Sequence, residues 1–282
     1  MLHFTKMHGI GNDYIYINGF EETLPADLPA LARRMSPRHT SVGSDGLILI
    51  LPSDTADVRM RMFNPDGSEA EMCGNGIRCV AAYSYDRGLC PRTQMTIETR
   101  AGIKNATVLL DDLGRSLAVR VDMGAPVTAG DRIPSRFISN PVTMQPLTAL
   151  GQTFPVTLVN MGNPHAVTFV EDAAAAPVLT AGPVLEHDSV FPARANIEFV
   201  QVKDRSHLMM RVWERGAGET HACGTGACAA AVAAVLNNLA ERSVTVHLLD
   251  GDLDIVWDTD SNHVHMTGPI AYVYEGIWSE NE

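Results

Sequence analysis

Two Cys-Gly-Xaa-Gly turns contain the residues of this chain that are best suited to chemistry. Cys73 opens the sequence CGNG at 73–76, and Cys223 opens CGTG at 223–226. A run typical of a helix follows each motif, so each cysteine is predicted to lie at a helix start. Unpaired backbone N–H groups and the helix dipole favour negative charge at that position. We therefore expect a thiol of lowered pKa and a binding site for a carboxylate at both turns.

Two such thiols on opposite sides of one carboxylate-bearing carbon have the geometry needed to invert a stereocentre. One thiolate would remove the α-proton from one face, and the other thiol would deliver a proton to the opposite face. The helix starts would stabilise the negative charge that develops on the carboxylate. This chemistry requires no cofactor and no metal.

Other roles for the cysteines are weaker alternatives. A single cysteine before a helix is more often a small buried hydrophobic residue, but duplicated positions disfavour that interpretation. Zinc is also disfavoured, because five and four residues separate Cys73 from Cys79 and Cys223 from Cys228, and these intervening segments begin helices. Structural zinc sites prefer shorter spacings on a turn. We interpret Cys79, Cys90 and Cys228 as structural or incidental thiols.

The two motifs belong to a repeat that extends through the whole chain. FNPDGSEAEMCGNG (63–76) aligns with WERGAGETHACGTG (213–226) at an offset of 150, with four identities. Further pairs occur in the same order, and a period this long indicates a duplicated domain. These pairs are Gly11-Asn12 with Gly162-Asn163, DGLILI (45–50) with ANIEFV (195–200), and MGAP (123–126) with MTGP (266–269).

The elements that must position the cysteines are predicted to be mostly strands, with one central helix in each unit. The predicted strands have period-two or β-branched patterns. They cover 14–18, 47–51, 57–63, 94–99 and 104–110, and then 157–159, 166–170, 197–203, 207–213, 244–249 and 252–257. Helices are predicted at 76–87 and at 226 to about 241, with an amphipathic helix near 29–35. The predicted fold is α+β: two pseudo-symmetric domains, each a mostly antiparallel β-sheet wrapped around a central helix.

Composition limits the function classes. The 282 residues are 45% hydrophobic and 19% charged, which is ordinary for a globular protein of one or two domains. A formal charge of −12 without a basic run excludes a nucleic-acid partner. The longest apolar stretch, 227–236, has about half of the ~20 residues that a membrane span needs. Without a signal-peptide pattern or a disulfide framework, we expect a cytoplasmic protein that acts on a small molecule.

Five motifs together closely resemble the diaminopimelate epimerase family. They are FTKMHGIGNDYIYIN, GSDGLILI, FNPDGSEAEMCGNGIRC, NMGNPHAV and WERGAGETHACGTGACA. The resemblance implies a pyridoxal-independent homodimeric enzyme that converts LL-2,6-diaminopimelate to the meso isomer, in lysine and peptidoglycan-precursor biosynthesis. It also implies that the last strand returns to the first domain. The expected boundaries are 1–118 plus 269–282 for the first domain and 119–268 for the second.

The resemblance implies site residues at positions that match the family's motifs. Cys73 and Cys223 match its acid/base pair, and His165 and Glu214 match residues that tune the two thiols. Gly46 stands where some members have Gln, so we leave it out of the site. The expected substrate contacts are Asn12, Asn64, Asn163 and Asn196, the helix-start pairs Gly74-Asn75 and Gly224-Thr225, and the pair Glu214-Arg215 for the far end of the substrate.

Three alternatives remain beside this interpretation. A proline racemase-like enzyme on the same fold would also use two thiols, but its first motif normally has His where this chain has Asn75. Phenazine-biosynthesis isomerases resemble the fold but lack the two cysteines. A protein without enzymatic activity would need neither thiol. Because a turn-forming role is common for Asn after Gly, the asparagines depend most on the resemblance.

Overall fold

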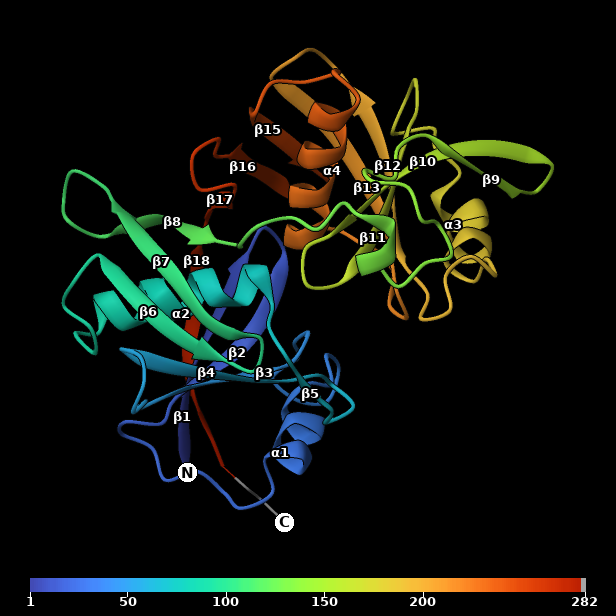
Figure 1. Ribbon diagram of the computed structural model, residues 1–282. Helices are drawn as coiled ribbons and strands as arrows, with labels where there is room; N and C mark the ends of the chain where they lie inside the picture. The colour runs from blue at the N-terminus through green and yellow to red at the C-terminus, as the bar shows by residue number, and fades with distance from the viewer. Residues whose placement is uncertain (280–282) are drawn as a thin grey trace. The chain divides into compact units, whose positions relative to one another are not determined.

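The computed structural model describes residues 1–279 and divides the chain into two compact units (Figure 1). The first unit comprises Met1–Val121 and the segment that begins at Thr267, and the second comprises Asp122–Met266. Each unit combines a run of paired β-strands with two α-helices.

In the first unit, the sheet pairs its strands in the order β18, β1, β2, β3, β4, β6, β7 and β8, and the short β5 pairs with β4. Pairing is antiparallel except at β2–β3 and β4–β6, which are parallel. The elements are β1 (Leu2–Gly9), β2 (Asn12–Asn18), α1 (Leu28–Met35), β3 (Leu47–Leu51), β4 (Val58–Phe63), β5 (Glu69–Ala70), α2 (Gly74–Asp86), β6 (Gln94–Thr99), β7 (Gly102–Leu110), β8 (Ser116–Asp122) and β18 (Ala271–Trp278).

The second unit repeats this pairing pattern, with parallel pairs at β11–β12 and β13–β15 and antiparallel pairs at the other positions from β9 to β16. The matched order of elements and pairings confirms the duplication predicted from the sequence. The elements are β9 (Gln145–Ala149), β10 (Gln152–Asn160), β11 (Pro164–Phe169), α3 (Val178–Glu186), β12 (Asn196–Val202), β13 (His207–Glu214), β14 (Gly218–Thr220), α4 (Gly224–Leu236), β15 (Ser243–Leu248) and β16 (Gly251–Trp257). Strand β17 (Val264–Pro269) begins in this unit and ends beyond its last residue, Met266.

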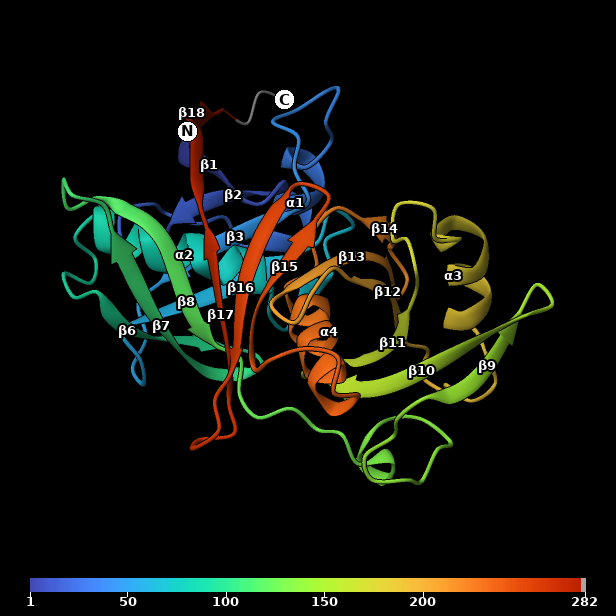
Figure 2. The same ribbon diagram turned by 90° about the horizontal axis from the view of Figure 1, so that it is seen from above.

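Each sheet curves around its central helix, as predicted. Helix α2 contacts β1, β2, β3, β4, β6 and β7, and α4 contacts the corresponding strands of the second unit. Figures 1 and 2 both show α4 lying along β16. Ten of the 13 residues of α4 are buried, and six of these ten are alanines, whose small side chains allow strands to approach on several sides.

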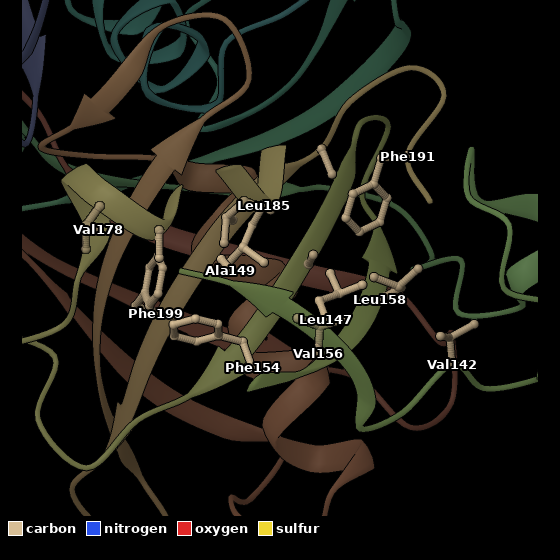
Figure 3. Packing of buried hydrophobic residues seen from close by; sticks show 14 of the residues in the cluster. Val142, Leu147, Ala149, Phe154, Val156, Leu158, Val178, Leu185, Phe191 and Phe199 are labelled. Atoms are coloured by element: carbon tan, nitrogen blue, oxygen red, sulfur yellow. The ribbon is translucent and has the colours of Figure 1, made fainter. Parts of the chain in front are cut away.

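The core of the second unit also packs against α3, a helix that the sequence did not predict. Phe154 and Phe199 meet edge to face with ring centres 6.0 Å apart, and Val178 and Leu185 of α3 belong to the same cluster (Figure 3). The sequence VLTAGPVLE did not indicate a helix, because it contains a Gly-Pro pair and both residues normally disfavour helices. Here Gly182 lets α3 approach Trp213, since an added Cβ would lie 2.7 Å from the Trp213 side chain.

The predicted elements correspond to observed ones, but several boundaries differ. Both central helices begin two residues earlier than predicted, so that Cys73 and Cys223 are their N-cap residues. Helix α4 ends at Leu236 rather than near Glu241, because Asn238 adopts a left-handed backbone with φ 58°. The residue patterns did not predict β1, β5, β8, β9, β14 or β17, and they predicted only three of the nine residues of β10. The last strand, which the family resemblance implied, is β18, and it pairs with β1.

Gly46→Ala is expected to destabilise the first unit by about 2–4 kcal/mol. Gly46 has φ 149°, and an added Cβ would lie 2.3 Å from the carbonyl oxygen of Phe63, so backbone strain and a steric clash add together. Urea unfolding measures the loss. Gly102→Ala is the matched control, because Gly102 also has a positive φ (91°) but an added Cβ meets nothing within 4 Å. Equal losses in the two variants would contradict the role of the clash.

Candidate active site

In the first unit, Cys73 caps the buried helix α2. Its backbone is extended (φ −129°, ψ 122°), and its Sγ accepts a hydrogen bond from the Gly76 N–H at 3.4 Å. The β4–β5 hairpin that precedes it is held by an ion pair between Arg61 and Glu69 at 2.8 Å. The Cys73 side chain is partly exposed. The helix start therefore presents this thiol and the first N–H groups of α2 together.

Asn12 and Asn75 lie against the Cys73 thiol. Asn12 Oδ1 accepts from Cys73 Sγ at 3.3 Å and from Asn75 Nδ2 at 3.4 Å. The Asn12 Nδ2 in turn donates to Asp45 at 2.8 Å, which fixes the amide orientation. Three predicted site residues are thus joined by hydrogen bonds. Asn64 is placed in the β4–β5 turn, where its Nδ2 donates to the Ser68 hydroxyl at 2.9 Å.

In the second unit, Cys223 caps α4 with the same local geometry. Its φ and ψ are −122° and 106°, and its Sγ accepts from the Gly226 N–H at 3.4 Å. The Thr225 hydroxyl lies 3.6 Å from this sulfur. An ion pair between Arg211 and Glu219 at 2.7 Å holds the β13–β14 hairpin, 150 positions after its counterpart in the first unit. The two cysteines are therefore duplicated in structure as well as in sequence.

His165 lies in a chain of buried polar side chains beside α4. Its Nδ1 is 2.6 Å from Glu198 Oε1, and its Nε2 is 3.0 Å from Asn163 Oδ1. The side chains of His165 and Glu198 are completely buried. Asn163 and His165, both predicted site residues, are thus in direct contact.

Asn196, Glu214 and Arg215, three further predicted site residues, are held by hydrogen bonds within this unit. Asn196 Nδ2 donates to the Pro164 carbonyl at 2.9 Å, and its Oδ1 accepts from the Arg215 backbone N–H at 2.9 Å. The Arg215 guanidinium donates to the Ala193 carbonyl at 3.3 Å. Glu214 accepts a hydrogen bond from the Thr220 hydroxyl. The Asn196 side chain, expected to contact substrate, ties together the residues before His165 and after Glu214.

The electrostatics at Cys223 differ from the prediction. Burial raises the pKa of the Cys223 thiol well above its ordinary value, and the carboxylates of Glu214 and Glu198 raise it further. The expectation of a lowered pKa at this helix start is therefore wrong. The predicted effect of the helix dipole is outweighed because desolvation and two nearby negative charges all disfavour the thiolate.

Three residues that lie near the cysteines in the structure were not identified from the sequence. Glu198 is a carboxylate in the apolar run ANIEFV, and a charged residue inside such a strand was a usable signal. Asp45 holds Asn12, and nothing in the sequence distinguishes it from a turn residue. Burial raises the pKa of Tyr14 well above its usual value, and the nearby Cys73 adds to this shift.

The other cysteines have structural surroundings. Cys79, Cys90 and Cys228 are buried, and burial raises the pKa of Cys79 to about 11. Within residues 1–279, the structure has no group of three or more His, Cys, Asp or Glu side chains arranged to hold a metal ion. Across the same residues, no helix has the length and apolar character that crossing a membrane requires.

Comparisons with known proteins agree with this arrangement. The family model of diaminopimelate epimerase matches residues 4–129 and 157–273. The chain is 55% identical to a diaminopimelate epimerase of Moorella thermoacetica, with 98% of each protein covered, and 53% identical to one of Acetivibrio thermocellus, with 100% of each covered. Among solved structures, a predicted epimerase from Pseudomonas aeruginosa has a TM-score of 0.70 at 17% identity, with 100% of each chain covered.

The fold and the sequence relatives show that this chain is an isomerase of the epimerase type. The likeness to solved structures establishes the fold, and the curated relatives, about half identical over their full length, establish the activity class. The chain belongs to the diaminopimelate epimerase family.

Proposed function

We propose that this protein interconverts LL- and meso-diaminopimelate, with Cys73 and Cys223 as the acid/base pair on opposite faces of one α-carbon. One observation carries the proposal: each cysteine is the N-cap of the buried central helix of its own unit, at equivalent positions of a duplicated fold. Full-length relatives with this activity support the substrate.

The reaction is balanced by the two sulfur atoms alone. A thiolate on one side accepts the α-proton, and the electron pair of the C–H bond moves toward the substrate carboxylate. The thiol on the other side then protonates the carbon from the opposite face, which inverts it. The helix-start groups of Gly74-Asn75 and Gly224-Thr225 are proposed to hold this carboxylate, because N–H groups at a helix start stabilise negative charge.

The polar residues of the second unit are proposed to set the protonation of Cys223 and to read the substrate. The raised pKa of Cys223 supports a protonated thiol at neutral pH, ready to donate a proton. A substrate ammonium beside Glu214 would offset the negative charge of this carboxylate and make the thiolate of Cys223 accessible for the reverse direction. Arg215 is proposed to bind the carboxylate at the far end of the substrate.

Epimerisation in heavy water tests this function. When LL-diaminopimelate is converted in D₂O, the meso product is expected to carry one deuterium at the inverted α-carbon, because the donating thiol exchanges its proton with solvent. Mass spectrometry and NMR of the separated isomers measure the label. Prior dialysis against hydroxylamine, which removes pyridoxal phosphate, should leave the rate unchanged. Failure to form labelled meso isomer would refute the proposed function.

We also infer that the enzyme is a cytoplasmic homodimer, as the family resemblance implies. Exposed apolar side chains on β18 support an interface between copies on this strand: Val273 is 53% exposed and Ile277 is 58% exposed. Light scattering of the purified protein should give twice the mass of one chain. Val273→Lys with Ile277→Lys is expected to shift the mass toward the monomer, whereas Leu113→Lys, an exposed apolar residue (75%) outside β18, should not. A monomeric wild-type protein would contradict the inference.

A further inference from the structure

We propose that Glu198 is a positioning residue of this enzyme, which holds the His165 ring and, through it, the Asn163 amide beside the start of α4. The kinetic part of this inference rests on the proposed function. The structural part, a proton held between Glu198 and His165, does not.

Glu198 is a buried carboxylate that directly contacts the His165 ring. Its Oε1 lies 2.6 Å from His165 Nδ1, and both side chains are completely buried. His165 Nε2 faces Asn163 Oδ1 at 3.0 Å, so the ring is held at both nitrogens. Rotation of the ring would break both contacts, and the contact with Glu198 lies where both side chains are completely buried. Glu198 therefore fixes the orientation of His165 and, with it, that of Asn163.

Comparison of the two halves of the duplicated chain shows that the His and the Glu occur together. Tyr14 corresponds to His165, because the register pairs the next residues, Ile15 with Leu47 and Ala166 with Ile197. Ile48, 150 positions before Glu198, is the counterpart of that glutamate and is also completely buried. Where the ring is a phenol, the facing strand supplies an apolar side chain. Where the ring is an imidazole, the strand supplies a carboxylate, which indicates a matched pair.

The charge of the pair follows from its burial. Among the described residues, Glu198 Oε2 is buried without a hydrogen-bond partner, and a full negative charge left there would be costly. Nε2 faces the Asn163 amide oxygen, which can only accept, so Nε2 carries one proton. A second proton, shared between Oε1 and Nδ1, then makes the pair neutral overall. Burial raises the pKa of Glu198, and the nearby carboxylate of Glu214 raises it further, whereas His165 lowers it. The Glu198 carboxylate by itself raises the pKa of the Cys223 thiol, and the positive charge that His165 gains in the neutral pair offsets part of that effect.

Gly226 provides the space that brings the carboxylate to the thiol. An added Cβ at Gly226 would lie 3.0 Å from Glu198 Oε1 and 3.1 Å from Cys223 Sγ. The carboxylate and the sulfur therefore border the same small volume under the first turn of α4. In the first unit, the corresponding volume at Gly76 is bordered by the methyl group of Ile48 instead.

Glu198→Gln tests the proposal, because it preserves the size of the side chain but cannot share a proton as a carboxylate does. In the wild-type enzyme labelled at histidine, proton NMR should show a strongly downfield resonance for the Nδ1 proton of His165. The resonance should be absent in Glu198→Gln and in His165→Asn. Glu186→Gln is the matched control, because Glu186 is also buried in this unit but bonds to Trp213 and Gly216, so this variant should keep the resonance.

The kinetic expectation is a fall in kcat of about 100-fold in Glu198→Gln, the lower end of what a positioned acid/base group contributes, with a much smaller change in KM. Because Glu198 acts through His165, the double variant Glu198→Gln/His165→Asn should be no slower than His165→Asn alone. A purely structural role would add a further loss in the double variant. Two results would overturn the proposal. One is the absence of the downfield proton resonance from the wild-type spectrum, and the other is additive losses of kcat in the double variant. Failure of the wild-type enzyme to epimerise diaminopimelate would instead refute the proposed function and leave the NMR result to decide the shared proton.

Discussion

Replacing Cys73 or Cys223 with alanine is expected to reduce epimerisation of LL-diaminopimelate by at least about 1,000-fold, within the range that a positioned proton carrier contributes. Each face of the α-carbon needs its own carrier, so one remaining thiol can neither complete nor reverse the inversion. Chromatographic separation of the LL and meso isomers measures the rate directly, and the expected loss is the same from either isomer.

Cys90→Ala is the matched control for these variants. Cys90 is buried, and its counterpart in the second unit is Ala240, so the duplicated fold already accommodates alanine at this position. This variant should retain activity close to that of the wild type. If Cys223→Ala kept more than about a tenth of the wild-type rate, proton transfer by two thiols would have to be abandoned.

The second large effect is expected from Asp13→Ala, which should lower the free energy of unfolding by about 3–5 kcal/mol. Lys6 Nζ lies 2.5 Å from Asp13 Oδ2, with only 6% of the Lys6 side chain exposed. Removing the carboxylate leaves a buried ammonium without its counter-charge, and Arg38 loses its contact with Asp13 as well. Urea unfolding at pH 7 measures the loss. Adding Lys6→Met should recover part of it, because no charge then remains buried.

The same pair gives the protein a defined acid sensitivity. Burial by itself would raise the pKa of Asp13, but hydrogen bonds and charge from Arg38 and Lys6 outweigh it and lower the pKa. A group with a lowered pKa in the folded state stabilises the fold above its unfolded pKa of about 3.9, and this stability is lost as the pH falls through the folded pKa.

The difference in stability between wild type and Asp13→Ala should therefore shrink below about pH 4. Glu241→Ala is the control, because the ion pair of Glu241 with Arg205 is 61% exposed on both sides and should contribute at most about 1 kcal/mol. A difference between wild type and Asp13→Ala that did not depend on pH would contradict this account.

Much of the fold was predictable because the chain is duplicated. The repeat paired the two central helices, and period-two or β-branched patterns predicted most strands, including β3 and β6 with their observed bounds. The sequence could not predict α3, since Gly182 and Pro183 disfavour a helix locally and only packing against Trp213 compensates. The two-residue strand β5 is too short to show any periodic pattern.

The parts of the candidate site that depend on residues close together in the sequence could be predicted. The parts that depend on contacts with distant strands could not. The helix-start positions of Cys73 and Cys223 follow from the residues around them, and so does the placement of Gly76 and Gly226. The pKa of Cys223 does not, because it depends on a carboxylate brought under the helix from β12. Asn196 shows the same limit, since its amide is occupied by the backbone of two other segments.

The pairing of β18 with β1 has a consequence for the order in which the two units can form. Residues of the second unit are continuous in the chain, so this unit has all its strands once synthesis passes Met266. The first unit must wait, because β1 gains its outer neighbour only when residues 271–278 have left the ribosome. Until then β1 presents an open edge of unpaired N–H and C=O groups, the kind of surface that recruits other strands. Nascent chains are thus most exposed to aggregation after β1 to β8 have formed and before β18 arrives.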